Sequence, residues 1–178
     1  MSQFKENSNA QIFKLFGLKN ADGKVILNPI YDQIYSFSEG IAQIVLHEKY
    51  GFVDNMGNII VEPKYEEATI FREGLAAVKL NSKWGFINRK GKVVIDFMYD
   101  YAIYFENGIT EVKLNGKYGI INKKGKQLTE IKYDHIGNFE NGFAPVSYFK
   151  DGKAIFKYIN EAGKEFETNT WILCKHIV

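Results

Sequence analysis

The sequence has little cysteine, little charge imbalance and no long hydrophobic run. Cys174 is the only cysteine among 178 residues, so no intramolecular disulfide can form and folding does not depend on oxidation. The net charge of +2 is too small to indicate a nucleic-acid binder by itself. No stretch approaches the roughly 18 apolar residues of a membrane-spanning helix, and no basic segment followed by an apolar run opens the chain. We therefore expect no signal peptide, no membrane segment and a cytoplasmic setting.

The composition indicates a folded chain built from repeats. Hydrophobic residues make up 46% and aromatic residues 15%, which excludes a disordered chain. Three residue types recur with a period of 34, namely Gly17, Gly51, Gly85 and Gly119; Tyr31, Tyr65, Tyr99 and Tyr133; and Phe37, Phe71, Phe105 and Phe139. A fixed period of this size indicates a stack of like units. The richness in Lys, Asn, Ile, Tyr and Phe is typical of an AT-rich bacterial or phage genome.

Each unit has the pattern of three β-strands. Residues 50–54 are aromatic and β-branched, residues 55–58 form a polar turn, and residues 59–63 are again β-branched, which predicts a β-hairpin. Gly57 and its equivalents at 23, 91 and 125 are expected to supply the positive φ of that turn. Residues 75–80 form a third, alternating strand, with Ala76, Val78 and Leu80 on the face that we expect to point inward. The repeated phenylalanines are expected to form an aromatic core stack.

The expected fold is an all-β tandem array of about five 34-residue, three-stranded antiparallel units. A period of 34 also fits helical tetratricopeptide repeats. Three glycines per unit and β-branched runs such as residues 93–95 argue against helices. The array could be an open solenoid or could curl towards a propeller. We favour the open form, because three strands and 34 residues are fewer than a four-stranded propeller blade uses.

Residues 1–178 are expected to form a single β domain. Its parts are an N-terminal cap strand within residues 1–16, repeats at 17–50, 51–84, 85–118 and 119–156, and a degraded repeat with a C-terminal cap at 157–178. The spacing grows by four residues within the segment 148–153, shortly before the degraded repeat. Irregular ends are expected in such an array, because the end units must cover the open edges of the stack.

The segments 49–54 (KYGFVD), 83–88 (KWGFIN) and 117–122 (KYGIIN) resemble the WG (KWG) repeat of bacterial proteins. The similarity extends to residues 63–66, 71–78 and 91–95, and it covers about residues 10–166. Tryptophan stands at the signature position only at Trp84, whereas Phe16, Tyr50 and Tyr118 replace it elsewhere. The resemblance implies an all-β repeat module with a binding or scaffolding role. It supplies no catalytic residues and no defined partner.

The sequence offers no catalytic or metal-binding constellation. His47 and His135 occupy different repeat positions, His176 lies outside the array, and no Cys-x-x-Cys or His-x-x-x-His spacing occurs. Acidic residues follow the repeated tyrosines at Asp32, Glu66, Asp100 and Asp134. We interpret these acids as turn caps that accept a backbone N–H, rather than as a catalytic row. We therefore expect no enzyme activity, no metal, no cofactor and no small-molecule substrate.

Two adjacent units carry basic turns at the same place. The residues are Arg89, Lys90 and Lys92 in one turn and Lys123, Lys124 and Lys126 in the next. Equivalent turns of stacked units stand side by side, so these side chains are a candidate contact for RNA, DNA or another anion. Ordinary solvated turns are the alternative interpretation.

Departures from the repeat are the candidate protein-binding residues. Phe97 and Met98 replace a Pro and its neighbour in earlier units, and the insertion contributes Tyr148, Phe149 and Lys150. Large apolar residues at irregular positions favour a protein interface, and local repacking is the alternative. We predict a non-enzymatic protein-binding module, an adaptor or an inhibitor of a larger protein complex, with a phage or defence setting as one context. The alternative is a nucleic-acid-binding protein that uses the stacked basic turns.

Overall fold

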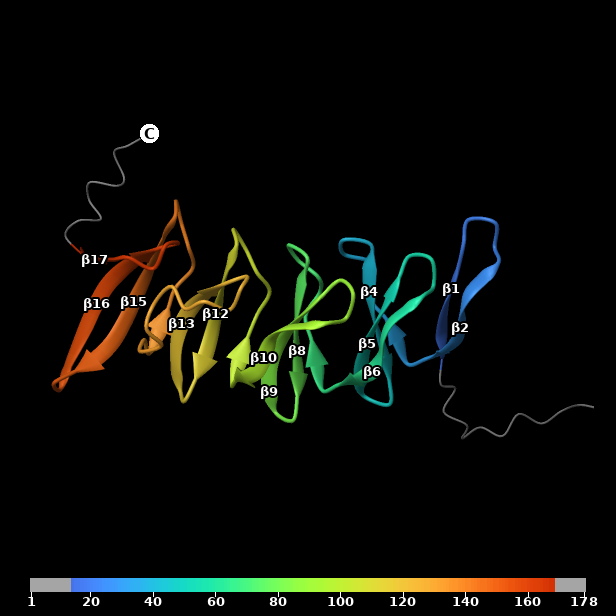
Figure 1. The fold of residues 1–178 in the computed structure, drawn as a ribbon, viewed down its shortest axis with the longest axis horizontal. Coiled ribbons are helices and arrows are strands. Elements are labelled where there is room, and N and C mark those ends of the chain that lie inside the picture. Colours follow the sequence, from blue (N-terminus) through green and yellow to red (C-terminus); the bar gives the residue numbers. More distant parts are fainter. Residues whose placement is uncertain (1–13, 169–178) are drawn as a thin grey trace, which may run out of the picture.

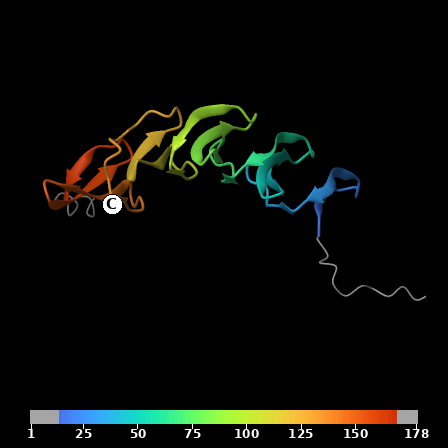
Figure 2. The same cartoon turned by 90° about the horizontal axis from the view of Figure 1, so that it is seen from below.

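The chain forms an open row of small antiparallel β-sheets. The computed structural model describes residues 14–168, which contain 17 strands in five sheets and no α-helix. The sheets follow one another along the row in chain order, and the row is gently bowed in the perpendicular view (Figures 1 and 2). The first and last sheets lie at opposite ends, so the array does not close on itself. Within the described range no helix is long and apolar enough to cross a membrane.

The strands group into an N-terminal hairpin and four units. The hairpin comprises β1 (Phe16–Lys19) and β2 (Val25–Tyr31). The first unit comprises β3 (Gln33–Ile34), β4 (Ile41–Leu46), β5 (Lys49–Asp54) and β6 (Ile59–Tyr65), and the second comprises β7 (Glu67–Ala68), β8 (Leu75–Leu80), β9 (Lys83–Asn88) and β10 (Val93–Tyr99). The third comprises β11 (Tyr101–Ala102), β12 (Ile109–Leu114) and β13 (Lys117–Asn122), and the fourth comprises β14 (His135–Ile136), β15 (Phe143–Lys150), β16 (Lys153–Asn160) and β17 (Glu165–Glu167).

The all-β antiparallel architecture is confirmed, and the repeats at 17–50, 51–84 and 85–118 each have the three predicted long strands, whereas the repeat at 119–156 lacks the second of them. A short strand of two residues also opens each of the four units, and sequence reasoning missed it. Each sheet combines the third strand of one sequence repeat with the hairpin of the next, so sheets begin at positions 33, 67, 101 and 135. In the third unit, isolated bridges from Gln127 and Tyr133 to β13 replace the fourth strand. The proposed caps fall partly on residues 1–13 and 169–178, which lie outside the described residues.

The polar turn inside each hairpin is an Asx turn. The Asp54 Oδ1 accepts the backbone N–H groups of Met56 at 2.9 Å and Asn58 at 2.8 Å, and Asn88 and Asn122 repeat this arrangement. The turn glycine has positive φ, 86° at Gly57, as the sequence predicted. An Asx side chain that holds its own turn fixes the hairpin register locally.

The glycine that marks the period has a different role, because it lies within a strand. At Gly51 an added Cβ would lie 2.5 Å from the carbonyl oxygen of Val61, and at Gly85 it would lie 2.7 Å from that of Ile95. The partner strand therefore crosses too closely for any side chain, and the pairing register shifts at this place. Sequence analysis placed Gly51 within the first strand of its hairpin but did not anticipate this crossing.

The core lies in the seams between consecutive units. Phe71 packs on Phe52 with ring centroids 5.0 Å apart, and Phe105 packs on Phe86 at 4.9 Å. Phe71 and Phe105 are therefore core residues, as expected, but each packs edge-on or tilted against a phenylalanine of another repeat position and not in a stack of the repeated phenylalanines. Phe37 is 43% exposed, and Phe139 is half-buried. The positions that carry Phe52 and Phe86 hold Leu18 in the hairpin and Ile120 in the third unit, so both exceptions lack an aromatic partner there.

Candidate functional site

The fourth unit carries a hairpin that is longer than its counterparts. Strands β15 and β16 have eight residues each, whereas β12 and β13 have six. The additional residues extend the hairpin to a two-residue turn at Asp151 and Gly152, both with positive φ. This is the insertion that the sequence marked as a departure from the repeat, and in the structure it is paired β-sheet apart from its two turn residues.

One face of this hairpin exposes aromatic rings. Phe149 is 70% exposed and Phe156 is 64% exposed. In the register of the hairpin, Phe149 lies opposite Ala154 and Ser147 lies opposite Phe156. Directly opposed residues of an antiparallel pair point to the same side, so both rings share one face as diagonal neighbours. Sequence reasoning selected Phe149 and missed Phe156, which only the strand register brings beside it.

The same face of the earlier units is covered by the unit that follows. In the first unit Gln43 is only 7% exposed, and its amide donates to the carbonyl of Ala68 in the second unit at 2.7 Å. Among residues 14–168 no further unit follows the fourth, so Phe149 and Phe156 occupy an end face. We call these two residues the end-face aromatics.

The opposite face of the hairpin is anchored in the protein. Tyr148 is half-buried, with its ring centroid 5.8 Å from that of Tyr133. Tyr133 donates its hydroxyl to Glu165 at 2.8 Å, and the ammonium group of Lys132 lies 2.9 Å from the same carboxylate. Lys157 completes the network at 3.1 Å. Tyr148 is therefore part of the support of the hairpin, and Lys150 lies exposed near its tip.

Electrostatics within this network are strong. Burial alone would raise the pKa of Glu165, but the hydrogen bonds from Lys132, Tyr133 and Lys157 outweigh it and lower the pKa to about 2. Burial and the hydrogen bond to Glu165 raise the pKa of Tyr133 far above its ordinary value. The carboxylate therefore stays ionised and the phenol stays protonated under ordinary conditions, which holds the base of the hairpin in one arrangement.

The second candidate pair, Phe97 and Met98, is divided by the fold. Phe97 is half-buried, with its ring centroid 6.2 Å from that of Tyr65 in the preceding unit. Met98 is exposed on β10. Neighbouring residues of a strand point to opposite sides, so these two do not form a joint surface.

The basic turns are divided in a similar way. Arg89 donates to the backbone carbonyl of Glu39 at 2.6 Å, and Lys123 lies 3.9 Å from the Glu73 carboxylate, so each is directed towards an earlier unit of the array. The remaining basic side chains of the two turns are exposed, and the Asx turns of Asn88 and Asn122 hold their backbones. These four are Lys90, Lys92, Lys124 and Lys126.

The repeated acids cap turns, as the sequence predicted. Asp32 accepts the backbone N–H of His47 at 2.6 Å, Asp100 that of Asn115 at 2.7 Å, and Asp134 that of Phe149 at 3.0 Å. Glu66 accepts the N–H of Ser82 in the same way. Within the described residues no three His, Cys, Asp or Glu side chains gather closely enough to hold a metal ion.

A comparison with known protein families identifies the repeat. A family model described as the WG containing repeat matches four consecutive segments, residues 16–50, 50–84, 84–118 and 118–153. No curated protein sequence matches the chain.

Among solved structures, the chain is similar to Hsv2 of Kluyveromyces lactis. Two structures of this protein give a TM-score of 0.50, and in each the similarity covers 87% of this chain. The first is 13% identical and is covered over 58% of its own length, and the second is 12% identical and is covered over 57%. Hsv2 of Kluyveromyces marxianus gives a TM-score of 0.48 and 14% identity over 86% and 57%. The chain thus spans less than two thirds of the length of these proteins. At such identities the likeness concerns the fold alone.

Proposed function

The chain belongs to the family of the WG containing repeat, and on that premise we propose that it is a non-enzymatic protein-binding module. The observation that carries the proposal is the pair of end-face aromatics, Phe149 and Phe156, which are 70% and 64% exposed on one face of a hairpin. Exposed large apolar side chains gathered on one face are typical of protein interfaces, where aromatic residues dominate the binding energy.

The contacts that hold the opposite face of the hairpin in place suit a protein-binding role. Tyr148 is held on the opposite face by Tyr133 and Lys132, and Lys157 of β16 is paired with Glu165. A surface that is already ordered loses little conformational entropy when a partner docks, so more of the contact energy becomes affinity. We propose that the protein acts in the cytoplasm as an adaptor, or as an inhibitor that occupies a surface of a larger complex. A bacterial or phage defence setting is the context we favour.

The proposal is tested by capture from host cytosol with the immobilised full-length chain. We expect a protein retained in stoichiometric amount by the wild type and lost from the Phe149→Ser, Phe156→Ser double variant. Met56→Ser is the matched control, because Met56 is 71% exposed at the opposite half of the array. Retention of the same protein by the double variant, with a native circular dichroism spectrum, would overturn the proposal.

The second candidate function is nucleic-acid binding, which the four exposed lysines of adjacent turns favour. Phosphate contacts make affinity fall steeply with salt. Capture that disappears after nuclease treatment, together with loss of binding in Lys90→Glu, Lys124→Glu, would favour this candidate over the first. Capture that resists nuclease and moderate salt would exclude it.

A further inference from the structure

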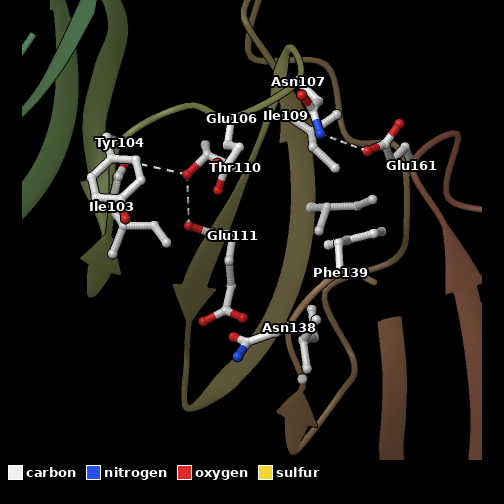
Figure 3. Close-up of a pocket in the computed structure, with 13 residues that line it drawn as sticks. Ile103, Tyr104, Glu106, Asn107, Ile109, Thr110, Glu111, Asn138, Phe139 and Glu161 are labelled. Atoms are coloured by element: carbon white, nitrogen blue, oxygen red, sulfur yellow. Dashed lines mark hydrogen bonds between the residues drawn. The ribbon is translucent and has the colours of Figure 1, made fainter. Parts of the chain in front are cut away.

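A cavity of about 360 Å³ opens in the seam between the third and fourth units. Tyr104 and Glu111 line it from the third unit, and Asn138 and Phe139 line it from the fourth (Figure 3). In the close-up the Glu111 side chain extends between Tyr104 on one side and Phe139 on the other.

Two replacements in the repeat explain why the seam is hollow here. Ile120 stands where Phe52 and Phe86 fill the earlier seams, so the ring that would meet Phe139 is missing. Gly137 stands where the earlier units carry Thr69 and Ile103, so another side chain is missing from the wall. A Cβ at Gly137 would lie 2.7 Å from Pro145 Cγ, so the fourth unit has no room for a side chain there.

The cavity is acidic. Its lining contains three glutamates and no lysine, arginine or histidine. Glu106 is paired with Arg72 at 2.7 Å, and Glu161 accepts the Asn107 amide at 3.0 Å. The Glu111 carboxylate accepts no hydrogen bond from a side chain of the described residues. Burial raises the pKa of Glu111, and the charges of His135 and Lys113, which lie outside the lining, act in the opposite direction without outweighing it.

The first unit shows what the array uses at the position of Glu111. Gln43 occupies that position there, and its amide donates across the seam to the Ala68 carbonyl at 2.7 Å. A carboxylate has no hydrogen to donate, so Glu111 cannot make this tie when ionised. The seam between the third and fourth units therefore presents a hydrogen-bond acceptor where the seam between the first and second units has a donor. A donor from outside the chain would complete this hydrogen bond.

The rim of the cavity already shows which donor fits such surroundings. The Arg72 guanidinium lies 4.6 Å from the centroid of the Tyr104 ring while it pairs with Glu106. A planar guanidinium combines stacking on an aromatic ring with paired hydrogen bonds to a carboxylate. Within the cavity, Glu111 and Phe139 offer the same two elements, and no cation of the lining occupies them.

We propose that this cavity binds an arginine side chain of the partner protein, with Glu111 as its counter-ion and Phe139 beside its guanidinium. The proposal deepens the protein-binding function above, on which it rests for the source of the arginine. It assigns to the partner a projecting arginine that enters the seam at a distance from the end-face aromatics along the array.

The test is a titration of the full-length protein with N-acetyl-arginine methylamide, followed by NMR of labelled isoleucine methyl groups. We expect the signals of Ile109, Ile120 and Ile136, which line the cavity, to shift and saturate at millimolar probe. N-acetyl-citrulline methylamide, which has the same shape without the charge, should leave them in place. Glu111→Gln should weaken arginine binding at least tenfold, and Ile120→Phe should abolish it by filling the cavity. Glu62→Gln is the matched control, because Glu62 is an exposed acid outside the lining.

Equal shifts with the arginine and citrulline probes, or unchanged binding in Glu111→Gln, would overturn the assignment. The Phe149→Ser, Phe156→Ser variant separates this outcome from failure of the proposed function. It should bind the arginine probe as the wild type does while losing the captured protein. Saturable arginine binding without any captured protein would refute the proposed function and leave the cavity assignment standing.

Discussion

The seam between the second and third units and the seam between the third and fourth units join units of similar strand order but differ in their cores, and β13 lacks the long partner strand that β9 has in β10. In the former, Phe86 and Phe105 meet with ring centroids 4.9 Å apart and both are fully buried. In the latter, Ile120 faces a half-buried Phe139 and a cavity of about 360 Å³ remains. The comparison teaches that a repeat array can create a candidate binding site by losing side chains at one seam, without gaining a new motif.

The exposed edges of the two seams carry equivalent ion pairs. Lys83 pairs with Asp100 across the former, and Lys117 pairs with Asp134 across the latter, both at 2.5 Å. These pairs are substantially exposed, and exposed ion pairs contribute little to stability. These ion pairs therefore do not account for an energetic contrast between the seams, which we attribute mainly to the buried rings.

We expect the largest loss of stability from a substitution in the seam between the second and third units, where two buried rings meet. Phe105→Ala removes a fully buried ring and leaves a cavity, so we expect a loss of about 3–5 kcal/mol in the free energy of unfolding. Phe139→Ala removes a half-buried ring beside an existing cavity, and we expect about 1–2 kcal/mol. Urea unfolding followed by circular dichroism measures both. Equal losses in the two variants would show that the seam between the third and fourth units is packed as tightly as the seam between the second and third units.

The next effect tests the strand crossing in the two units. Gly85→Ala would place a Cβ 2.7 Å from the Ile95 carbonyl oxygen, which is backbone and cannot move aside cheaply. In Gly119→Ala the nearest atom is the Ile131 side-chain Cγ1 at 2.9 Å, which can rotate, and the nearest backbone atoms lie farther away than at Gly85, at 3.1 Å. We expect a loss of about 2–3 kcal/mol for the first and of about 1 kcal/mol for the second, again from urea unfolding. A larger loss for Gly119→Ala would contradict the steric explanation.

The sequence predicted the elements that repeat and missed those that depend on register. The period of 34 predicted the array, the β-branched runs predicted strands, and the segments 49–54, 83–88 and 117–122 indicated the family. The polar turns were predicted from their glycines, whereas the Asx hydrogen bonds at Asp54 and Asn88 were not. Phe156 could not be predicted as a partner of Phe149, because the longer hairpin sets their register. The seam cavity was not predicted, because Ile120 and Gly137 indicate nothing until their neighbours across the seam are known.

A third variant sharpens the comparison by making the open seam resemble the filled one. Ile120→Phe restores the ring that Phe52 and Phe86 supply elsewhere, so we expect a gain of about 1 kcal/mol from cavity filling. In that background Phe139→Ala should become more costly, because the ring would then have an aromatic partner. A double-mutant cycle from urea unfolding measures this coupling. Independent, additive effects would show that the two side chains do not meet.

The smallest expected effect concerns pH and the carboxylates of the C-terminal half. The pKa of Glu111 is raised in the folded protein by burial, so its contribution to stability is fully present below the ordinary pKa of 4.5 and is lost as pH rises through the folded value. The contribution of Glu165 to stability depends on pH in the opposite direction. Its pKa is lowered to about 2, so its contribution is present above pH 4.5 and is lost as pH falls towards 2.

Glu111→Gln should therefore stabilise the protein near pH 7 and change it little near pH 3.5, where Glu111 is already protonated. The amide can also make the tie that Gln43 makes in the first seam, for which we expect about 0.5–1 kcal/mol. Glu165→Gln should do the reverse and destabilise the protein at pH 7, because the amide loses the pairing with Lys132 and Lys157. Thermal unfolding of both variants across pH 3–8 measures how the change in stability caused by each substitution depends on pH. If Glu111→Gln destabilised the protein at pH 7, the carboxylate would have to be satisfied within the chain, and the seam cavity would lose its reason to bind a cation.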